Sequence, residues 1–418
     1  MDMIERSKRL NDVFYELRGP IYEKSKELEQ QGHRVTKLNI GNPAPFGFNA
    51  PDAVIEHIIA NLRHAQGYSD HKGLVSAREA IKAYYETKGI ANIHIDDIFI
   101  GNGVSEMAMH AVQALVNTGD EILVPSPDYP IWTAAVNFSG GKTVHYLCDE
   151  ESDWFPDLAD IRRKITSRTK AIVLINPNNP TGAVYSKEIL EELVKLSVEH
   201  DLVIFSDEIY DKILYDGTIH YPTAALSDEA VIVTFAGLSK NYLSAGFRAG
   251  WMVVTGDKAK AASYIDGLNT LASLRVCSNV PAQHAIKVAL EGYQEMNDLV
   301  LPTGRLGQQR EVCYNKLTAI PGITCVKPKG AFYMFPKIDV RKFNIQNDFR
   351  FALDFLQEQH VLLVQGKGFN WHQPDHFRIV YLPSVEELIQ TMDKLDVFLS
   401  TYWQQDVKAG VSQEAIEL

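Results

Sequence analysis

The chain has 418 residues, of which 41 are Lys or Arg and 53 are Asp or Glu, so the formal net charge is −12. At roughly 150 residues per domain, this length excludes a single small module. The composition, 45% hydrophobic and 22% charged, excludes a disordered, collagen-like or coiled-coil chain. Because an acidic chain without a basic stretch repels phosphate backbones, nucleic acid is not an expected partner.

The cysteines and the N-terminal residues indicate the expected compartment. The four cysteines (Cys148, Cys277, Cys313 and Cys325) form no C-x-x-C pair, which argues against a zinc cluster or a disulfide framework. The opening MDMIERSKRLND lacks the apolar core of a signal peptide, and no later stretch reaches the roughly 18 apolar residues of a membrane span. We therefore expect a cytoplasmic protein without a membrane partner.

The first two thirds of the chain read as alternating helices and strands. A helix is predicted over 20–31, because Pro20 favours the first turn and Gly32 follows the end. From residue 98 to 235, short apolar runs alternate with helical stretches such as 104–117 and 186–199. Runs that are apolar at every position suit a parallel sheet covered on both faces, with ligands at the carboxyl edge of its strands.

After about residue 301 the pattern changes to short strands mixed with helices predicted over 347–359 and 384–402. This pattern indicates a second, smaller α+β unit. The predicted division is an N-terminal arm and part of the small unit (1–47), a large unit (48–300) and a C-terminal small unit (301–418).

Two segments resemble known binding motifs but lack a required feature. Gly101 and Gly103 begin a dinucleotide fingerprint, but Glu106 occupies the place of its last glycine. His372 and His376 are four residues apart, but Pro374 between them argues against a helix that presents both to a metal. We expect neither a dinucleotide site nor a metal site.

Polar residues follow several of the apolar runs. The turn-forming segment NPNNPTG (176–182) follows AIVLI, Asp207 follows LVIF, and Lys240 follows VIVTF, with Arg248 eight residues further on. An acid, an ammonium and a guanidinium could therefore converge on one sheet edge. Pyridoxal phosphate chemistry needs these groups: a lysine amine, an acid that protonates the pyridine nitrogen, and cations or helix-end amides for the phosphate.

The motifs NPNNPTG, SDEIY, LSK and GFRAGW, in this order and with Lys240 33 residues after Asp207, resemble the class I/II aminotransferases of the pyridoxal-phosphate fold type I group. The resemblance covers the chain from about Leu38 to about Pro383. More narrowly, YELRGP, LNIGNPAPFGF and the length resemble the alanine aminotransferases of the bacterial glutamate–pyruvate type. The sequence departs from the family pattern at Leu243 and Ser244. The resemblance implies an α/β fold with a mostly parallel seven-stranded sheet in the large domain and a smaller α+β domain.

The resemblance also implies roles around pyridoxal 5'-phosphate. Lys240 would hold the cofactor as a Schiff base and move the substrate proton, and Asp207 would pair with the pyridine nitrogen. Tyr210 and Asn179 would hydrogen-bond the phenolic oxygen of the cofactor, and Tyr129 would lie over its ring. The expected phosphate ligands are Gly103, Val104, Ser105, Ser239, Arg248 and Tyr68. In this family the tyrosine reaches the phosphate from the neighbouring subunit, so a homodimer is expected.

For the substrate, the resemblance implies that Arg378 forms a bidentate pair with the α-carboxylate, assisted by Asn179 and by a backbone group of Gly41. A fixed buried arginine for the glutamate side chain would be left unpaired when alanine is bound. Arg18, in the arm, is therefore the candidate for the side-chain carboxylate, with Tyr15 in the same pocket wall.

The function that follows is transfer of the amino group between L-alanine/pyruvate and L-glutamate/2-oxoglutarate. Other classes remain open on sequence alone. An aminotransferase of aromatic, aspartate or branched amino acids, a C–S β-lyase or a decarboxylase would use the same cofactor residues. A cofactor-sensing regulator is disfavoured because no basic patch or helix-turn-helix segment precedes the fold.

Overall fold

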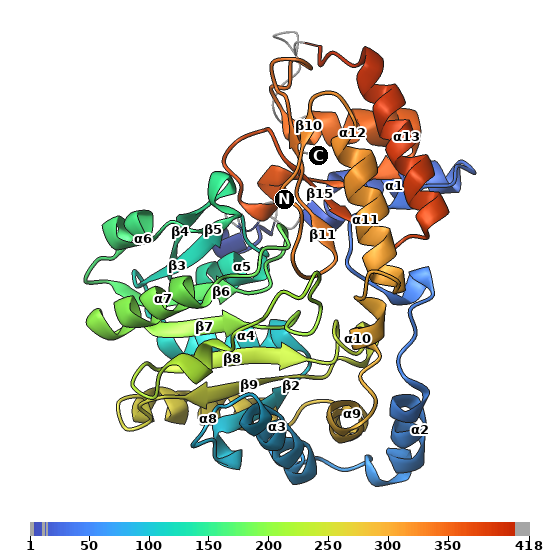
Figure 1. The fold of residues 1–418 in the computed structure, drawn as a ribbon. Coiled ribbons are helices and arrows are strands. Elements are labelled where there is room, and N and C mark those ends of the chain that lie inside the picture. The colour runs from blue at the N-terminus through green and yellow to red at the C-terminus, as the bar shows by residue number, and fades with distance from the viewer. Residues whose placement is uncertain (1–3, 11–12, 14–15, 406–418) are drawn as a thin grey trace.

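The computed structural model describes residues 4–10, 13 and 16–405, which form a large α/β unit and a smaller α/β unit beside it (Figure 1). Within these residues, no helix is long and apolar enough to cross a membrane.

In the described part of the chain, the large unit contains a sheet of eight strands in the order β2-β9-β8-β7-β6-β3-β4-β5. Neighbours from β8 to β4 are parallel, whereas β9 is antiparallel to both of its neighbours. The sheet is therefore mostly parallel, as predicted, but the predicted seven strands are joined by an eighth. This is β5, a two-residue edge strand antiparallel to β4, too short to give a periodic signal in the sequence. The strands are β2 (Ile98–Gly101), β3 (Glu121–Ser126), β4 (Lys142–Asp149), β5 (Phe155–Pro156), β6 (Thr169–Ile175), β7 (Val203–Asp207), β8 (Ile232–Gly237) and β9 (Gly250–Thr255).

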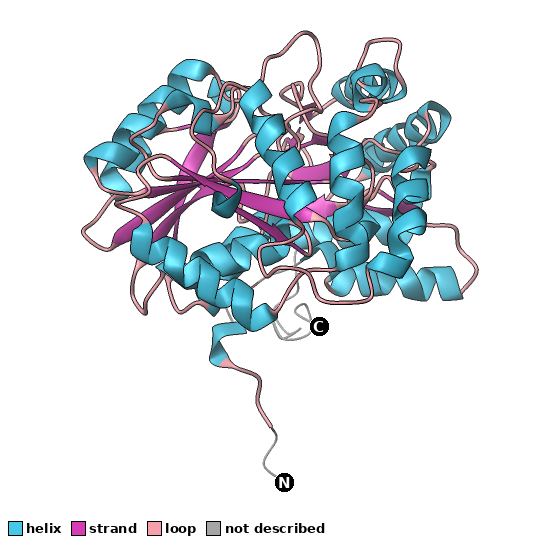
Figure 2. Cartoon of the chain, turned by 90° about the horizontal axis from the view of Figure 1, so that it is seen from below, coloured by secondary structure: helices cyan, strands magenta, loops and turns pink. Residues whose placement is uncertain are grey.

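Helices cover both faces of this sheet (Figure 2). Along β6, Ile172 and Leu174 join one apolar cluster while Val173 and Ile175 join another, because successive side chains of a strand point to opposite faces. This alternation explains why the strand is apolar at every position. The helices of the large unit are α2 (Asp52–Asn61), α3 (Val75–Thr87), α4 (Val104–Leu115), α5 (Ile131–Phe138), α6 (Leu158–Lys164), α7 (Lys187–Glu199), α8 (Ala262–Arg275) and α9 (Val280–Glu291).

The smaller unit combines short strands with helices over a separate apolar cluster. Its helices include α12 and α13, which match the two predicted over 347–359 and 384–402 to within a residue or two. The strand β1, near the N-terminus, pairs in parallel with β13, so this early segment packs with the C-terminal unit. The elements are α1 (Pro20–Gln30), β1 (Thr36–Lys37), α11 (Arg305–Thr318), β10 (Ile323–Thr324), β11 (Tyr333–Met334), β12 (Lys337–Ile338), α12 (Asp348–Gln359), β13 (Val361–Leu362), β14 (Val364–Gln365), β15 (Phe377–Val380) and α13 (Val385–Thr401), and the short helix α10 (Met296–Leu299) lies in the segment that leads from α9 to α11.

The register of the central strands sets where the polar segments meet. Ile175 at the end of β6 lies opposite Asp207 at the end of β7, and Asp207 lies opposite Phe235 of β8. The segments that follow these three strands therefore begin side by side at the carboxyl edge of the sheet.

Three glycines lie in register at the ends of neighbouring strands: Gly101 of β2, Gly250 of β9 and Gly237 of β8. A Cβ at residue 250 would lie 2.7 Å from the carbonyl carbon of Gly103 and 2.7 Å from the amide nitrogen of Val104. The absence of a side chain at residue 250 thus lets the start of α4 approach the sheet.

We predict that Gly250→Ala lowers the free energy of unfolding by about 1–3 kcal/mol, because the added methyl group meets backbone atoms that cannot move aside cheaply. Urea unfolding of the cofactor-free protein measures the change. Gly246→Ala is the matched control, since an added Cβ at that position has no neighbour within 4 Å. Equal midpoints for the two variants would contradict the close approach.

Candidate active site

Lys240 lies three residues beyond β8, and its amine points into the region between the two units. Its Nζ donates a hydrogen bond to the carbonyl oxygen of Gly41, 2.6 Å away, and lies 5.6 Å from the ring centroid of Phe332. Burial lowers the pKa of Lys240 to about 7, aided by the positive charges of Arg378 and Arg248 and opposed by Asp207. A substantial fraction of this amine is therefore uncharged near neutral pH, which is the form that attacks a carbonyl carbon.

Asp207, the last residue of β7, is 3% exposed. Its carboxylate accepts hydrogen bonds from the indole Nε1 of Trp132 (3.1 Å) and from the amide of Ile209 (3.3 Å). Burial raises the pKa of Asp207 to about 6, although the bond from Trp132 opposes the rise. A buried carboxylate of this kind gains free energy from a cationic partner such as a protonated ring nitrogen.

Tyr210 is buried on the segment after β7, and its hydroxyl lies 2.7 Å from the hydroxyl of Tyr333 on β11. Burial raises the pKa of Tyr210 well above its usual value, so the phenol stays protonated and can donate a hydrogen bond. A Cβ at Gly41 would collide with the same hydroxyl of Tyr333. Only glycine thus fits at residue 41 beside Tyr333.

Arg378 on β15 is 1% exposed and lies between two aromatic rings. The carbon of its guanidinium is 4.5 Å from the ring centroids of both Tyr333 and Phe369. Its Nη1 donates to Oδ1 of Asn179 (2.9 Å), and its Nη2 donates to the carbonyl oxygen of Asn39. These contacts fix a planar guanidinium, the group best shaped for bidentate binding of a carboxylate.

A third positive group, the guanidinium of Arg248, lies beside the start of α4. Gly103 has a φ of 89°, which glycine adopts without strain, and a side chain at this position would collide with the guanidinium of Arg248. Arg248 is exposed and donates to the carbonyl oxygens of Asn102 (3.0 Å) and Ala245 (2.9 Å). A helix N-terminus beside a guanidinium is a favourable site for a phosphate. Val104 and Ser105 form the first turn of α4.

Two more predicted residues lie nearby in the chain. Tyr129, partly buried, follows β3 and precedes by three residues the tryptophan that contacts Asp207. Ser239, 8% exposed, immediately precedes Lys240.

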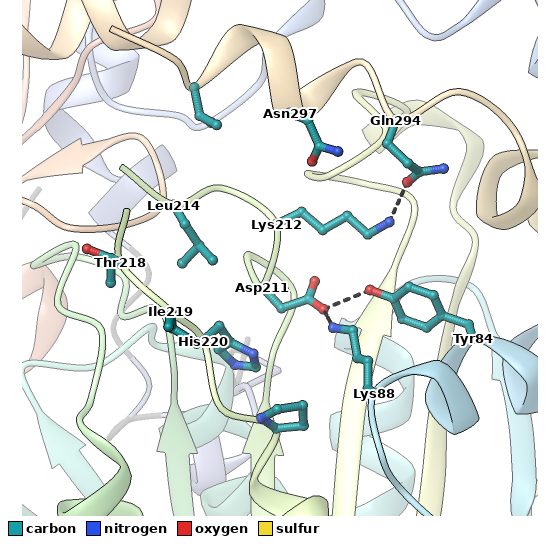
Figure 3. A pocket seen from close by; sticks show the side chains of 12 residues that line it. Tyr84, Lys88, Asp211, Lys212, Leu214, Thr218, Ile219, His220, Gln294 and Asn297 are labelled. Carbon is teal, nitrogen blue, oxygen red and sulfur yellow. Dashed lines mark hydrogen bonds and ion pairs between the residues drawn. The ribbon is translucent and has the colours of Figure 1, made fainter. Parts of the chain in front are cut away.

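The segment that carries Asp207 and Tyr210 continues into Asp211 and Lys212, which line a separate cavity (Figure 3). The side chain of Asn241, next to Lys240, donates to Oδ1 of Asp211 at 2.6 Å. The lysine segment is thus tied to the wall of this cavity.

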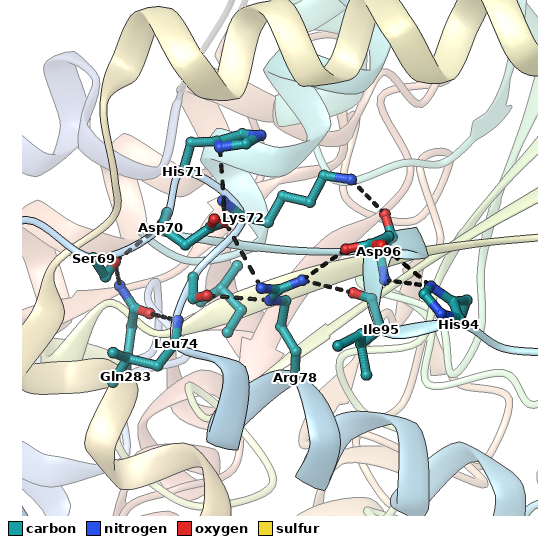
Figure 4. A network of polar contacts seen from close by, with 12 residues as sticks. Ser69, Asp70, His71, Lys72, Leu74, Arg78, His94, Ile95, Asp96 and Gln283 are labelled. Atoms are coloured by element: carbon teal, nitrogen blue, oxygen red, sulfur yellow. Dashed lines mark hydrogen bonds and ion pairs between the residues drawn. The ribbon is translucent and has the colours of Figure 1, made fainter.

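The structure does not bring Tyr68 into contact with the residues above. Its side chain is exposed (85%), whereas the loop that follows it is firmly held (Figure 4). Gln283 of α9 donates to Oγ of Ser69 (3.2 Å) and accepts from the amide of Leu74 (2.7 Å). Arg78 of α3 donates to the carbonyl oxygen at the end of this loop, Gly73, at 3.1 Å. The tyrosine therefore projects outward from an ordered loop.

Two residues of the N-terminal arm, Arg18 and Tyr15, are predicted to bind the side-chain carboxylate of glutamate. Arg18 is exposed, and Tyr15 lies outside the described residues. Between Arg18 and the site, the carbonyl oxygen of Leu17 accepts a hydrogen bond from the side-chain amide of Asn39 at 2.9 Å. Since the carbonyl of Asn39 accepts from Arg378, the arm is two hydrogen bonds away from that guanidinium.

Four residues that the structure places at the site are not among those selected from the sequence: Asn39, Trp132, Tyr333 and Phe369. The side chains of Trp132, Tyr333 and Phe369 and the backbone carbonyl of Asn39 contact Asp207, Tyr210 or Arg378, and none of the four carries a charge. A signal existed only for Trp132, which stands one helical turn after Tyr129 at the start of α5.

The comparisons with known proteins agree with this geometry. The family described as aminotransferase class I and II matches residues 33–395. The chain belongs to this family. Glutamate-pyruvate aminotransferase AlaA of Escherichia coli K12 is 58% identical over 97% of the chain and 100% of that protein, and an alanine aminotransferase of Mycobacterium tuberculosis is 52% identical over 96% and 93%. A crystal structure of an Escherichia coli aminotransferase superposes with a TM-score of 0.96 at 57% identity, covering 97% of this chain and all of the other.

Enzymes of the class I and II aminotransferase family depend on pyridoxal phosphate, and the residues of this chain fit that cofactor. The buried carboxylate of Asp207 suits a protonated pyridine nitrogen, and the side-chain-free Gly103 beside Arg248 suits a phosphate. The lowered pKa of Lys240 suits an amine that bonds to an aldehyde. The protein is therefore a pyridoxal-phosphate-dependent aminotransferase of fold type I, as its sequence predicts.

We predict that Lys240 of the cofactor-free protein reacts with an acylating reagent with a midpoint near pH 7. Below this pH the amine is protonated and unreactive, and above it the free amine predominates, whereas ordinary lysines titrate near pH 10.4. Peptide mapping at a series of pH values measures the midpoint, with exposed lysines as internal controls. Arg378→Ala should move the midpoint upward, because one repelling charge is lost. A midpoint above pH 9 in the unmodified protein would contradict the geometry.

Proposed function

We propose that the enzyme moves the amino group between L-alanine/pyruvate and L-glutamate/2-oxoglutarate. The observation that carries the proposal is Arg378, fixed by Asn179 and Asn39 on the side of Lys240 where an α-carboxylate would lie. The names of full-length relatives support the choice of substrates: one is a glutamate-pyruvate aminotransferase and another an alanine aminotransferase.

Five residues would act at the cofactor ring. Pyridoxal phosphate, when bound, supplies the electron sink for charge that develops at the substrate Cα. Lys240 carries the proton that leaves and returns to this carbon, because its amine is buried and titrates near neutral pH. Asp207 would stabilise the protonated ring nitrogen, and Tyr210 would donate a hydrogen bond to the phenolic oxygen of the ring. Asn179 would donate a second hydrogen bond to this oxygen, and Tyr129 would pack on the ring.

The phosphate would be held at the start of α4. The backbone amides of Gly103, Val104 and Ser105 and the hydroxyl of Ser239 would donate hydrogen bonds to it, and Arg248 would supply the positive charge. The exposure of the Arg248 guanidinium leaves room for an anion on its outer side.

The substrate would be fixed by its α-carboxylate, with Arg378 as the bidentate partner and Gly41 and Asn179 beside it. Arg378 belongs to β15 of the small unit and Asn179 to the segment after β6 of the large unit. We therefore keep the division into an arm with part of the small unit (1–47), a large unit (48–300) and a small unit (301–418). The small unit would close over the bound substrate and exclude water.

Arg18 would bind the second carboxylate of glutamate. An exposed arginine can turn toward a dicarboxylic substrate and return to water when alanine is bound. The hydrogen bond from Asn39 to Leu17 keeps this part of the arm near Arg378.

The active unit would be a homodimer in which Tyr68 reaches the phosphate of the neighbouring subunit. Exposed apolar side chains on two adjacent segments, Tyr68 on one and Leu274 and Val276 on the other, support such a contact surface. Arg275 ties these segments together through the carbonyl oxygen of His71 at 2.8 Å. A cytoplasmic location is supported by the four cysteines, all of which are free.

We predict that the enzyme loaded with pyridoxal phosphate forms glutamate from alanine and 2-oxoglutarate, and that Lys240→Ala lowers kcat by at least about 1,000-fold, since it removes the proton carrier. A coupled pyruvate assay measures the rate, and Lys195→Ala on the exposed face of α7 is the control. Borohydride should attach the cofactor covalently at residue 240. Attachment at another lysine, or release of ammonia from a sulfur amino acid in place of amine transfer, would contradict the proposal.

Substitutions at Arg378 and Arg18 test separately the binding of the α-carboxylate, which all four substrates share, and of the side-chain carboxylate, which only glutamate and 2-oxoglutarate carry. Arg18→Ala should raise KM for glutamate and 2-oxoglutarate about tenfold, with little effect on alanine and pyruvate, because one charge-assisted hydrogen bond is lost. Arg378→Ala should impair all four substrates, since all share the α-carboxylate. Steady-state kinetics with each substrate pair decides the matter. Equal losses for both pairs in the Arg18 variant would show that this residue only anchors the arm.

A further inference from the structure

A cavity of about 570 Å³ opens beside the segment that follows Tyr210 (Figure 3). It is bounded by Asp211 and Lys212 on this segment, by Tyr84 of α3 and Lys88 directly after this helix, and by three residues in and around α10, namely Gln294, Asn297 and Val300. None of these residues has a role in the transamination described above.

In the wall of the cavity, Lys88 forms an ion pair with Asp211. Asp211, whose side chain is 3% exposed, contacts the ammonium of Lys88 and accepts hydrogen bonds from the hydroxyl of Tyr84 (2.9 Å) and the amide of Asn241 (2.6 Å). The positive charge of Lys88 is thus cancelled by a carboxylate that is otherwise fully hydrogen-bonded.

The second ammonium, that of Lys212, faces neutral groups. Its Nζ donates to the amide oxygen of Gln294 and lies 4.9 Å and 5.0 Å from the ring centroids of Tyr84 and Tyr242. Among the residues that the structure describes, no carboxylate oxygen lies within 4.0 Å of this nitrogen. Burial lowers the pKa of Lys212 to about 8, opposed by the negative charge of Asp211 and aided by the positive charge of Lys88. Of the three protons of the ammonium, two remain for a ligand.

The rest of the lining adds no further charge. His220 is neutral because burial lowers its pKa to about 4. Asn297 reaches toward the same space from α10, and Leu214, Ile219 and Val300 add an apolar wall. The cavity thus offers one uncompensated positive charge, a few neutral polar groups and an apolar surface.

We propose that this cavity binds a small organic monoanion, with a carboxylate on Lys212 and a short aliphatic body against Leu214, Ile219 and Val300. A single negative charge matches the single uncompensated ammonium, and the apolar wall favours an organic acid over inorganic phosphate. The site is connected to the active lysine by one side chain. Asn241, next to Lys240, bonds Asp211 and accepts from the backbone amide of Lys212 at 3.4 Å.

Butanoate is a suitable probe, because it carries one carboxylate and a three-carbon body and has no amino or oxo group to react. Its binding to the holoenzyme is measured by ligand-observed NMR in two backgrounds, the unmodified enzyme and Arg378→Ala. In each background, Lys212→Gln is compared with Lys195→Gln, an exposed lysine on α7 that serves as the matched control.

In the Arg378→Ala background we expect binding at one site, about tenfold weaker after Lys212→Gln and unchanged after Lys195→Gln, as expected for loss of a charge-assisted hydrogen bond. In the unmodified enzyme, butanoate should bind both at Arg378 in the active site and at Lys212 in the cavity, and Lys212→Gln should leave only the active-site binding. Unchanged butanoate binding after Lys212→Gln in both backgrounds would overturn the proposal. Displacement of butanoate by equimolar inorganic phosphate would also overturn it, because the site would then select charge alone.

Discussion

The site depends on three charged side chains that lie close together with little access to water: Asp207 and the half-buried Lys240 at the edge of the large sheet, and the buried Arg378 facing them from the small unit. Each charge loses hydration on burial and must recover the free energy from hydrogen bonds or from a ligand. Trp132, Gly41 and the pair Asn39 and Asn179 supply the hydrogen bonds. The ring nitrogen and the carbonyl of the cofactor would add partners for Asp207 and Lys240, and the carboxylate of the substrate would add one for Arg378.

The sheet brings these charges together through its register. The ends of β6, β7 and β8 lie side by side, so residues far apart in sequence follow one another along a single edge. The second unit then adds Arg378 and Tyr333 from the opposite side, and the hydroxyl pair of Tyr210 and Tyr333 joins the two units directly. The site therefore depends on how the units meet as well as on each unit alone.

The sequence predicts the elements whose signal is local. The helices at α1, α7, α12 and α13 and the parallel sheet follow from periodicity, because both sheet faces are covered and the strands are apolar throughout. Lys240, Asp207 and Arg248 could be selected because each follows a strand and carries a charge. The residues that orient them could not, since Tyr333 and Phe369 look like any core aromatic until the two units are placed together. The edge strand β5 was missed because two residues have no period.

Asn39 links two parts of the chain through its two ends: its side-chain amide binds Leu17 of the arm, and its carbonyl oxygen binds Arg378. A guanidinium that is already immobile loses little rotational entropy when a carboxylate arrives. The arm therefore contributes to affinity even without touching the substrate, because the guanidinium of Arg378 loses its rotational freedom when the protein folds and not when the substrate binds. The consequence is that proteolytic removal of the arm through Leu17 would take this acceptor away from Asn39 and weaken the binding of every substrate that Arg378 holds.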